Sequence, residues 1–185
     1  MNFQEKLANY VLGNLSISQF SDIALTGLRQ GVESESLLIL AGMSSIDNPF
    51  ELQTYFDKSL QELGITLPNK IEAAKVLLRY YLGKIIAHPE SALEVMRSVD
   101  NDVYHKVNWL NELGVKEKKF VGEELGLERL YTWYRELQDF EDEGMLLYYN
   151  DLPKEKQKQK FNEHLVEEAK VLKIKIDNEI SLYNT

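Results

Sequence analysis

The chain contains no cysteine among its 185 residues. Its absence excludes disulfide bonds, thiolate zinc sites, iron–sulfur clusters and cysteine nucleophiles. The sequence also lacks the continuous apolar run of about 20 residues that a membrane-spanning helix needs. The N-terminal segment 1–6 has neither the basic nor the apolar region of a signal peptide. We therefore expect a cytoplasmic protein that does not enter a membrane.

Motifs for nucleotide binding and nucleophilic catalysis are missing as well. The chain has no Gly-x-Ser-x-Gly turn, no Gly-x-x-x-x-Gly-Lys-Ser/Thr loop and no strand-linked Gly-x-Gly-x-x-Gly. The glycine pair Gly122 and Gly126 encloses Glu123 and Glu124, which would repel a phosphate. We therefore expect no cofactor, and the motifs favour a protein that is not an enzyme.

Histidine is too scarce for a metal site of the usual kind. The three histidines are His88, His105 and His164. Asp102 and His105 have the i, i+3 spacing of helical two-metal sites, but those sites need Glu-x-x-His motifs. The chain has no Glu-x-x-His. The sequence therefore predicts no metal site.

Positive charge is also in short supply. The formal net charge is −9, and no Lys or Arg lies between Arg29 and Lys58. Binding to a phosphate backbone needs clustered basic residues, so we expect no nucleic acid partner. The lysines at 154, 156, 158 and 160 alternate with other residues, including Glu155, and indicate a solvated helix end.

What the sequence does contain is helical periodicity along its whole length. We predict an all-α protein, a single compact domain of about seven to nine helices, with a weak seam near residues 114–126. Segment 69–85 is apolar on more than one face, so we expect it at the centre of the bundle. The predicted helices cover residues 3–11, 18–30, 34–42, 48–63, 69–85, 89–97, 103–113, 127–141 and 153–180. Residues 98–102 are predicted to interrupt the helical pattern, and 114–126, which include the lysine-rich run 116–119, to form a loop or short turns.

Several of these helices have recognisable ends. Ser18 and Ser34 can each cap a helix, and Gly31 can adopt the left-handed conformation that ends one. Gly42 can close the short helix that follows Ser34. Asn69 is followed three residues later by a glutamate, which is the pattern of a capping box.

One segment resembles a known group of proteins. Its residues are Gly31, Ser34, Ser36-Leu37 and Leu40-Ala41-Gly42, followed by Phe56, Leu60 and Glu62-Leu63-Gly64. This resembles a pattern found in small, largely uncharacterised bacterial all-α proteins and covers residues 20–65. The resemblance implies a helical fold and no established activity. Some of those proteins look like immunity or accessory factors encoded near toxins.

The strongest indication of function is an acidic segment that also carries aromatic residues. Five carboxylates fall within the eight residues 136–143, and aromatic residues precede, interrupt and follow them. Carboxylates beside exposed aromatics suit the capture of a basic protein, because charge steers the encounter and aromatics supply anchors. If 136–143 is helical, three of the carboxylates share one face. The predicted partner-binding residues are Glu136, Asp139, Glu141, Asp142, Glu143, Trp133 and Tyr134, and the shared face holds Glu136, Asp139 and Glu143.

Other interpretations of the same residues remain open. The acidic segment also fits a solvated helix end whose aromatics belong to the core, and two of its carboxylates could serve as acid and base in hydrolysis. An enzyme or small-ligand binder is the alternative function. Apolar helix faces could also form a homo-oligomer. The alternative pocket would be lined by Tyr80, Tyr81, Tyr104, Trp109 and Trp133.

Overall fold

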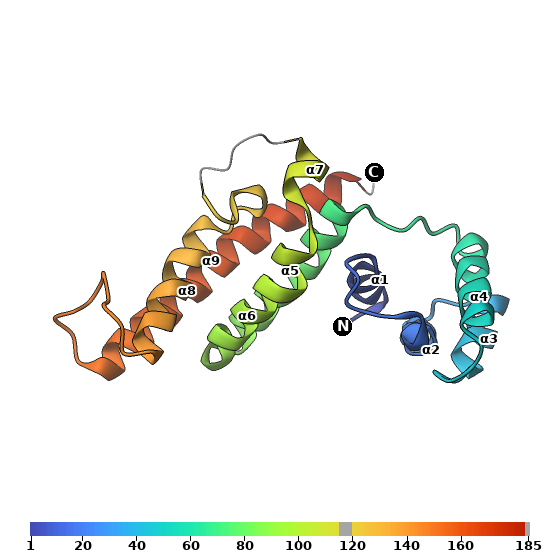
Figure 1. Ribbon diagram of the computed structural model, residues 1–185, viewed down its shortest axis with the longest axis horizontal. Helices are drawn as coiled ribbons and strands as arrows, with labels where there is room; N and C mark the ends of the chain where they lie inside the picture. The colour runs from blue at the N-terminus through green and yellow to red at the C-terminus, as the bar shows by residue number, and fades with distance from the viewer. Residues whose placement is uncertain (115–119, 184–185) are drawn as a thin grey trace. The chain divides into compact units, whose positions relative to one another are not determined.

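The computed structural model describes residues 1–114 and 120–183, and the side chains of all of these except 181–183. In this part of the chain there are nine α-helices and no strand, which confirms the predicted all-α fold (Figure 1). The lysine-rich run at 116–119 lies outside the described residues. The helices are α1 (Phe3–Val11), α2 (Phe20–Arg29), α3 (Glu35–Gly42), α4 (Pro49–Glu62), α5 (Lys70–Ala87), α6 (Ala92–Asp102), α7 (Trp109–Leu113), α8 (Glu128–Glu141) and α9 (Lys154–Tyr183).

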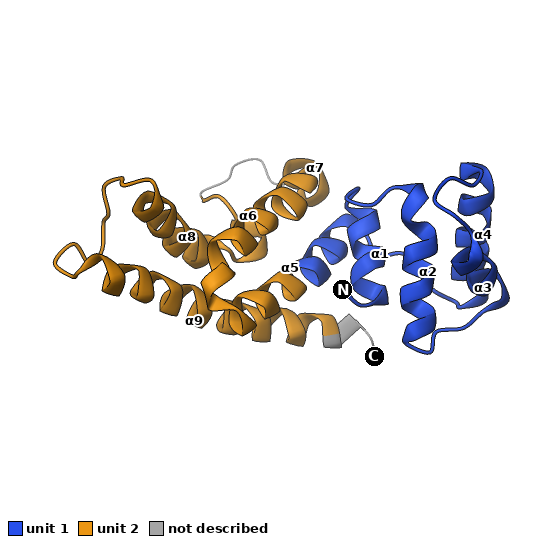
Figure 2. Ribbon diagram, turned by 90° about the horizontal axis from the view of Figure 1, so that it is seen from below, with its two compact units in different colours: residues 1–77 blue, residues 78–185 orange. Residues whose placement is uncertain are grey.

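Contacts divide the chain into two compact units, residues 1–77 and residues 78–185 (Figure 2). The division falls inside α5 and not in segment 114–126, where the seam was expected. This helix has fully buried residues on both sides of the division, such as Ala74 before it and Leu82 after it. The single domain stays a prediction. None of the helices in the described residues has the length and apolar character required to cross a membrane.

The core of the first unit is built from α1 to α4. The rings of Phe20 and Phe56 stack with their centroids 4.0 Å apart, and Tyr10 packs edge-on against both. Gly27 brings α2 close to α1, because a Cβ at that position would lie 3.0 Å from the ring of Phe3. The buried cluster consists of Phe3, Leu7, Phe20, Ile23, Ala24, Leu37, Leu40, Leu52, Phe56 and Leu60.

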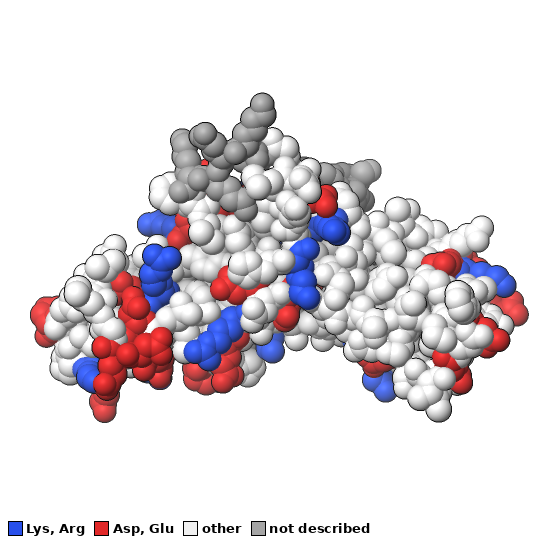
Figure 3. All heavy atoms as spheres, in the orientation of Figure 1, with Lys and Arg blue, Asp and Glu red and all other residues white. Residues whose placement is uncertain are grey.

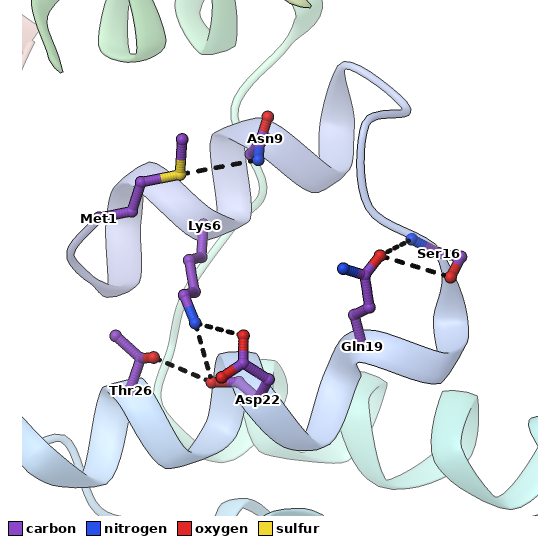
Figure 4. A network of polar contacts seen from close by, with 7 residues as sticks. All are labelled: Met1, Lys6, Asn9, Ser16, Gln19, Asp22 and Thr26. Atoms are coloured by element: carbon purple, nitrogen blue, oxygen red, sulfur yellow. Dashed lines mark hydrogen bonds and ion pairs between the residues drawn. The ribbon is translucent and has the colours of Figure 1, made fainter. Parts of the chain in front are cut away.

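A polar contact also joins α1 to α2, as Figure 4 shows. The ammonium group of Lys6 pairs with the carboxylate of Asp22 and donates to its main-chain oxygen at 3.3 Å. The hydroxyl of Thr26 donates to the same oxygen at 2.9 Å. The cap predicted at Ser18 is wrong. Ser16 precedes a 3₁₀ turn in which its N–H donates to the side chain of Gln19, and α2 begins only after that turn.

The other helix ends in this unit match their signals. Gly31 has a φ of 78°, and the hydroxyl of Ser34 accepts the N–H of Leu37. Asn69 and Glu72 exchange two hydrogen bonds of 2.9 and 3.0 Å, so the predicted capping box is confirmed. α3 ends at Gly42, as expected.

In the second unit, α8 packs along α9, and α6 contacts both helices. The interruption predicted at 98–102 is wrong, because α6 continues to Asp102. Val99 is fully buried within it, and the hydroxyl of Ser98 donates back to the main-chain oxygen of Glu94 at 3.3 Å. The chain leaves the helix only after Asp102. Segment 171–176 is helical within α9, as predicted.

Candidate functional site

The acidic segment spans the end of α8 and the connection that leads to α9. α8 ends at Glu141, and Glu143 adopts a left-handed conformation with a φ of 55°. The N–H of Gly144 closes this helix end by donating to the main-chain oxygen of Asp139 at 2.7 Å. The expected common face of Glu136, Asp139 and Glu143 is therefore wrong for Glu143, because the helix stops two residues before it.

Glu136 lies in the interior. Only 2% of its surface is exposed, and its carboxylate accepts the N–H of Leu147 at 3.0 Å and the N–H of Tyr148 at 3.2 Å. Hydrogen bonds to a charged acceptor are stronger than those between neutral groups. Tyr134 is also buried. Glu136 thus supports the connection from beneath, and we leave both buried residues out of the binding surface proposed below.

Further side chains hold the connection in place. The amide of Gln157 donates to the main-chain oxygen of Tyr149 at 2.9 Å, and the amide of Asn150 donates to that of Leu146 at 3.0 Å. The hydroxyl of Tyr149 lies 2.7 Å from Nε2 of His164. The connection is therefore tied to α8 through Glu136 and to α9 through two side chains.

Trp133 lies at the centre of an aromatic cluster under the connection. Its ring stacks on that of His164, with the ring centroids 3.9 Å apart and an angle of 9° between the planes. The ring centroids of Tyr148 and Tyr149 lie 5.1 and 6.4 Å from that of Trp133. His164 stands among charged residues in the sequence, which is typical of a surface side chain. Its position between the buried residues Phe161 and Leu165 was the signal that this side chain turns partly inward.

The remaining carboxylates lie on the outside. Glu141, Asp142 and Glu143 are exposed and Asp139 is half-buried. Figure 3 shows acidic side chains gathered, with some basic ones, at the end of the second unit where α8 leads into α9. Two lysines of α9 pair with this group. Lys158 contacts Glu141 at 2.5 Å, and Lys154 contacts Glu143 at 3.6 Å.

Exposed apolar side chains lie next to these carboxylates. Met145 is 85% exposed and Leu147 73%, and Tyr148 is exposed as well. A groove of about 410 Å³ runs beside Leu147 and Tyr148. Met145 and Leu147 were not among the predicted binding residues, although two long apolar residues in a charged connection are a visible signal. The groove is lined by Phe120, Val121, Glu128, Tyr131, Thr132, Arg135, Glu136, Leu147 and Tyr148.

The aromatic residues of the predicted alternative pocket contact different neighbours. Tyr104 and Trp109 are buried and stack at 5.8 Å, and the indole N–H donates to the main-chain oxygen of Tyr104 at 2.9 Å. Tyr80 and Tyr81 contact each other at 5.3 Å. Trp133 belongs to the cluster around His164. No ring of this set lines the groove beside α8, so we do not propose a ligand pocket from it.

Two tyrosines of the second unit bond to carboxylates of α6. The hydroxyl of Tyr81 donates to Asp102 at 2.6 Å, and that of Tyr131 donates to Asp100. Burial first, and then these hydrogen bonds, raise the pKa of both phenols well above the ordinary value of 10.0. Asp102 thus has a structural partner. Within residues 1–114 and 120–183, no three histidine or carboxylate side chains are placed to hold a metal ion.

Function has to be inferred from the chemistry of these residues. No protein-family model matches the chain, and neither the curated proteins nor the solved structures contain a match.

Proposed function

We propose that this protein is a cytoplasmic, non-enzymatic interaction module that binds a basic protein at the end of its second unit. The observation that carries the proposal is the exposure of three apolar side chains on a connection that Glu136 and His164 hold in place. We call this region the α8–α9 surface. It consists of Asp139, Glu141, Asp142, Glu143, Met145, Leu147 and Tyr148.

The apolar part supplies the binding energy. Burying one Leu or Met side chain contributes about 1.5–3 kcal/mol, so covering Met145 and Leu147 favours association. Exposed apolar patches with a polar rim are typical of protein-binding surfaces. The hydrogen bonds from Leu147 and Tyr148 to Glu136 keep this patch in one conformation. Less conformational freedom is then lost when the partner binds.

The charges select the partner. Four carboxylates rim the patch, and the whole chain has a net charge of −9, which steers a basic protein towards it. Lys154 and Lys158 reduce the local charge, but exposed ion pairs contribute only about 0–1 kcal/mol. A partner's arginine or lysine can therefore replace them. An immunity or accessory role, implied by the resemblance of residues 20–65, fits a module of this kind.

Affinity capture from the native host tests the proposal. The tagged full-length protein is compared with Asp142→Lys/Glu143→Lys and with Met145→Ser/Leu147→Ser. The matched control is Glu90→Lys/Glu94→Lys, which makes the same change in net charge at two exposed residues, one in the turn before α6 and one in α6. We expect one basic protein to be retained by the wild type and the control and lost from both surface variants.

Two outcomes contradict the proposal. The wild type could retain no protein at low salt, where charge attraction is strongest. Alternatively, the surface variants could retain the same protein as the control. Circular dichroism of each variant establishes that the helices are intact before the capture is interpreted.

A further inference from the structure

A second exposed apolar surface lies in the first unit, where α3 is connected to α4. Ile46 is 90% exposed and Phe50 83%, the first in the connection and the second in the first turn of α4. Neither belongs to the buried cluster of this unit. We call residues 44–51 the α3–α4 turn. Two large apolar side chains, Ile46 and Phe50, are thus exposed four residues apart in one short segment.

The α3–α4 turn is held in a defined shape. The side chain of Asp47 accepts the N–H of Ser44 at 2.7 Å, and the N–H of Asp47 donates to the main-chain oxygen of Ser44 at 3.0 Å. Asn48 caps α4 by accepting the N–H of Phe50 at 3.0 Å, and Pro49 fixes the first helical position. The two apolar side chains are therefore presented without the entropic cost of ordering a loose loop.

The charge around this turn has one sign. Between Arg29 and Lys58 the chain has no Lys, Arg or His. The same interval has five acidic residues, all of them exposed, so no basic side chain from this interval offsets their charge. The α8–α9 surface differs in this respect, because lysines pair with two of its carboxylates. The five residues are Glu33, Glu35, Asp47, Glu51 and Asp57.

We propose that the α3–α4 turn binds a basic amphipathic helix of a partner protein. Apolar residues on one face of that helix would cover Ile46 and Phe50, and its lysines or arginines would meet Asp47 and Glu51. Helices of this type dock through apolar residues spaced three or four apart. The inference is independent of the α8–α9 surface, because it rests on a different unit and on different residues.

The charges argue against two other occupants. A second copy of the chain, packed symmetrically on this turn, would bring Asp47 and Glu51 against the same residues of its partner. An anionic membrane would be repelled by the same carboxylates, since membrane-binding turns and helices rely on basic residues. A basic protein segment is the occupant that satisfies both the apolar and the acidic side chains.

A model peptide tests this inference on the full-length protein. The probe is a fluorescein-labelled peptide of leucine and lysine, roughly 14 residues or about four helical turns long, with leucine at helical spacing. The control probe has glutamate in place of lysine. We expect the wild type to bind only the lysine peptide, and Ile46→Ser/Phe50→Ser to weaken its binding at least tenfold. Hydrogen exchange should slow at residues 44–51 when the peptide is bound.

Two further variants separate the contributions. Asp47→Asn/Glu51→Gln keeps the acceptor for Ser44, so it should preserve the turn while weakening binding several-fold and reducing its salt dependence. Met145→Ser/Leu147→Ser alters only the α8–α9 surface and should leave peptide protection at the α3–α4 turn unchanged. Because Ile46 and Phe50 are exposed, their replacement should leave the urea unfolding midpoint unchanged.

Three results would overturn the inference. Ile46→Ser/Phe50→Ser could bind the lysine peptide as tightly as the wild type. The wild type could instead bind phosphatidylserine-containing vesicles through these residues, with loss in the variant, which would indicate a membrane. Light scattering could also show a dimer that the variant abolishes, which would assign the turn to a second copy of the chain.

Discussion

Glu136→Gln tests the buried carboxylate on which the shape of the α8–α9 surface depends. The native carboxylate accepts two backbone N–H groups, from Leu147 at 3.0 Å and from Tyr148 at 3.2 Å, at a position that is 2% exposed. A hydrogen bond to a charged group contributes about 1.5–3 kcal/mol. Both of these bonds go to Oε2, and Oε1 accepts the N–H of Leu147 at 3.3 Å. Glutamine can keep an oxygen at the Oε2 position, but it loses the charge and places a donor amide where Oε1 accepts. We therefore expect Glu136→Gln to destabilise the connection by about 1.5–3 kcal/mol.

Glu136→Ala removes both acceptors and should cost more, up to about 3–6 kcal/mol if water does not replace them. Leu147 and Tyr148 are exposed residues, so their N–H groups can reach water once the connection opens. The loss should consequently appear first as local opening of residues 143–149 and only in part as a lower global stability.

Hydrogen exchange measures this local opening directly. Each 1.4 kcal/mol corresponds to a tenfold change, so Glu136→Gln should reduce protection of the amides of Leu147 and Tyr148 by about ten- to a hundredfold. Fluorescence of Trp133 should change as well, because its ring contacts Tyr148 and Tyr149. Glu94→Gln is the matched control, since it neutralises an exposed carboxylate on α6.

Exchange of the two amides at the wild-type rate in Glu136→Ala would contradict this prediction. Unchanged exchange would mean that the connection keeps its shape without the carboxylate. A uniform loss of protection across α8 and α9 would also contradict it, because the effect would then be global rather than confined to residues 143–149.

Three further predictions concern the stability of each unit. Phe56→Ala should lower the free energy of unfolding of the first unit by about 3–5 kcal/mol, measured by urea titration, because its ring is buried against Phe20. Hydrogen bonds from Ser36, first from its hydroxyl and then from its N–H, lower the pKa of the Glu62 carboxyl. The stability that this pair contributes is present above the ordinary pKa of 4.5 and is lost as the pH falls through the lower pKa of the folded state. Ser36→Ala should therefore make the thermal unfolding temperature depend less on pH in the acid range. Burial and then the bond to Asp100 raise the pKa of Tyr131 above 10.0. The contribution of Tyr131 to stability is therefore complete below pH 10.0 and declines as the pH rises further. Tyr131→Phe should make thermal unfolding less sensitive to alkaline pH.

Signals that depend on a few consecutive residues could be predicted from the sequence. The capping box of Asn69 and Glu72 involves positions three apart, and the left-handed Gly31 needs only its own missing side chain. The cap predicted at Ser18 is wrong because the turn before α2 starts earlier, at Ser16, whose N–H donates to the side chain of Gln19.

The helical structure of residues 98–102 could not be predicted from neighbouring residues alone. A run with two aspartates and an asparagine is typical of a helix interruption, yet α6 continues through it. Val99 is buried in the core, Asp100 accepts the hydroxyl of Tyr131, and Asp102 accepts that of Tyr81. Tertiary partners 21 and 31 residues away in the sequence compensate for weak helix propensity, and no local pattern reveals them.

The segment that carries the family resemblance is explained by a contact within the first unit. The N–H and hydroxyl of Ser36 donate to the carboxylate of Glu62 at 2.9 and 2.6 Å. These two positions of the pattern are 26 residues apart. The contact ties the start of α3 to the end of α4, so this part of the pattern has a structural role, in agreement with the capping and core residue types that compose it.

The five carboxylates of 136–143 were all predicted to bind the partner, but their positions along α8 and after its end differ. Glu136 shares a helix face with Trp133 and Phe140, which pack against α9 and the connection. A carboxylate on an apolar face must find donors inside the protein, because burying it without partners is costly. Its donors are N–H groups of the chain that returns after α8 ends. Pairing with Leu147 and Tyr148 satisfies Glu136 and, for the same reason, directs Met145 and Leu147 outward beside the exposed carboxylates. The buried charge and the exposed apolar patch are thus two consequences of one contact, and a change at Glu136 should alter binding without the residue touching the partner.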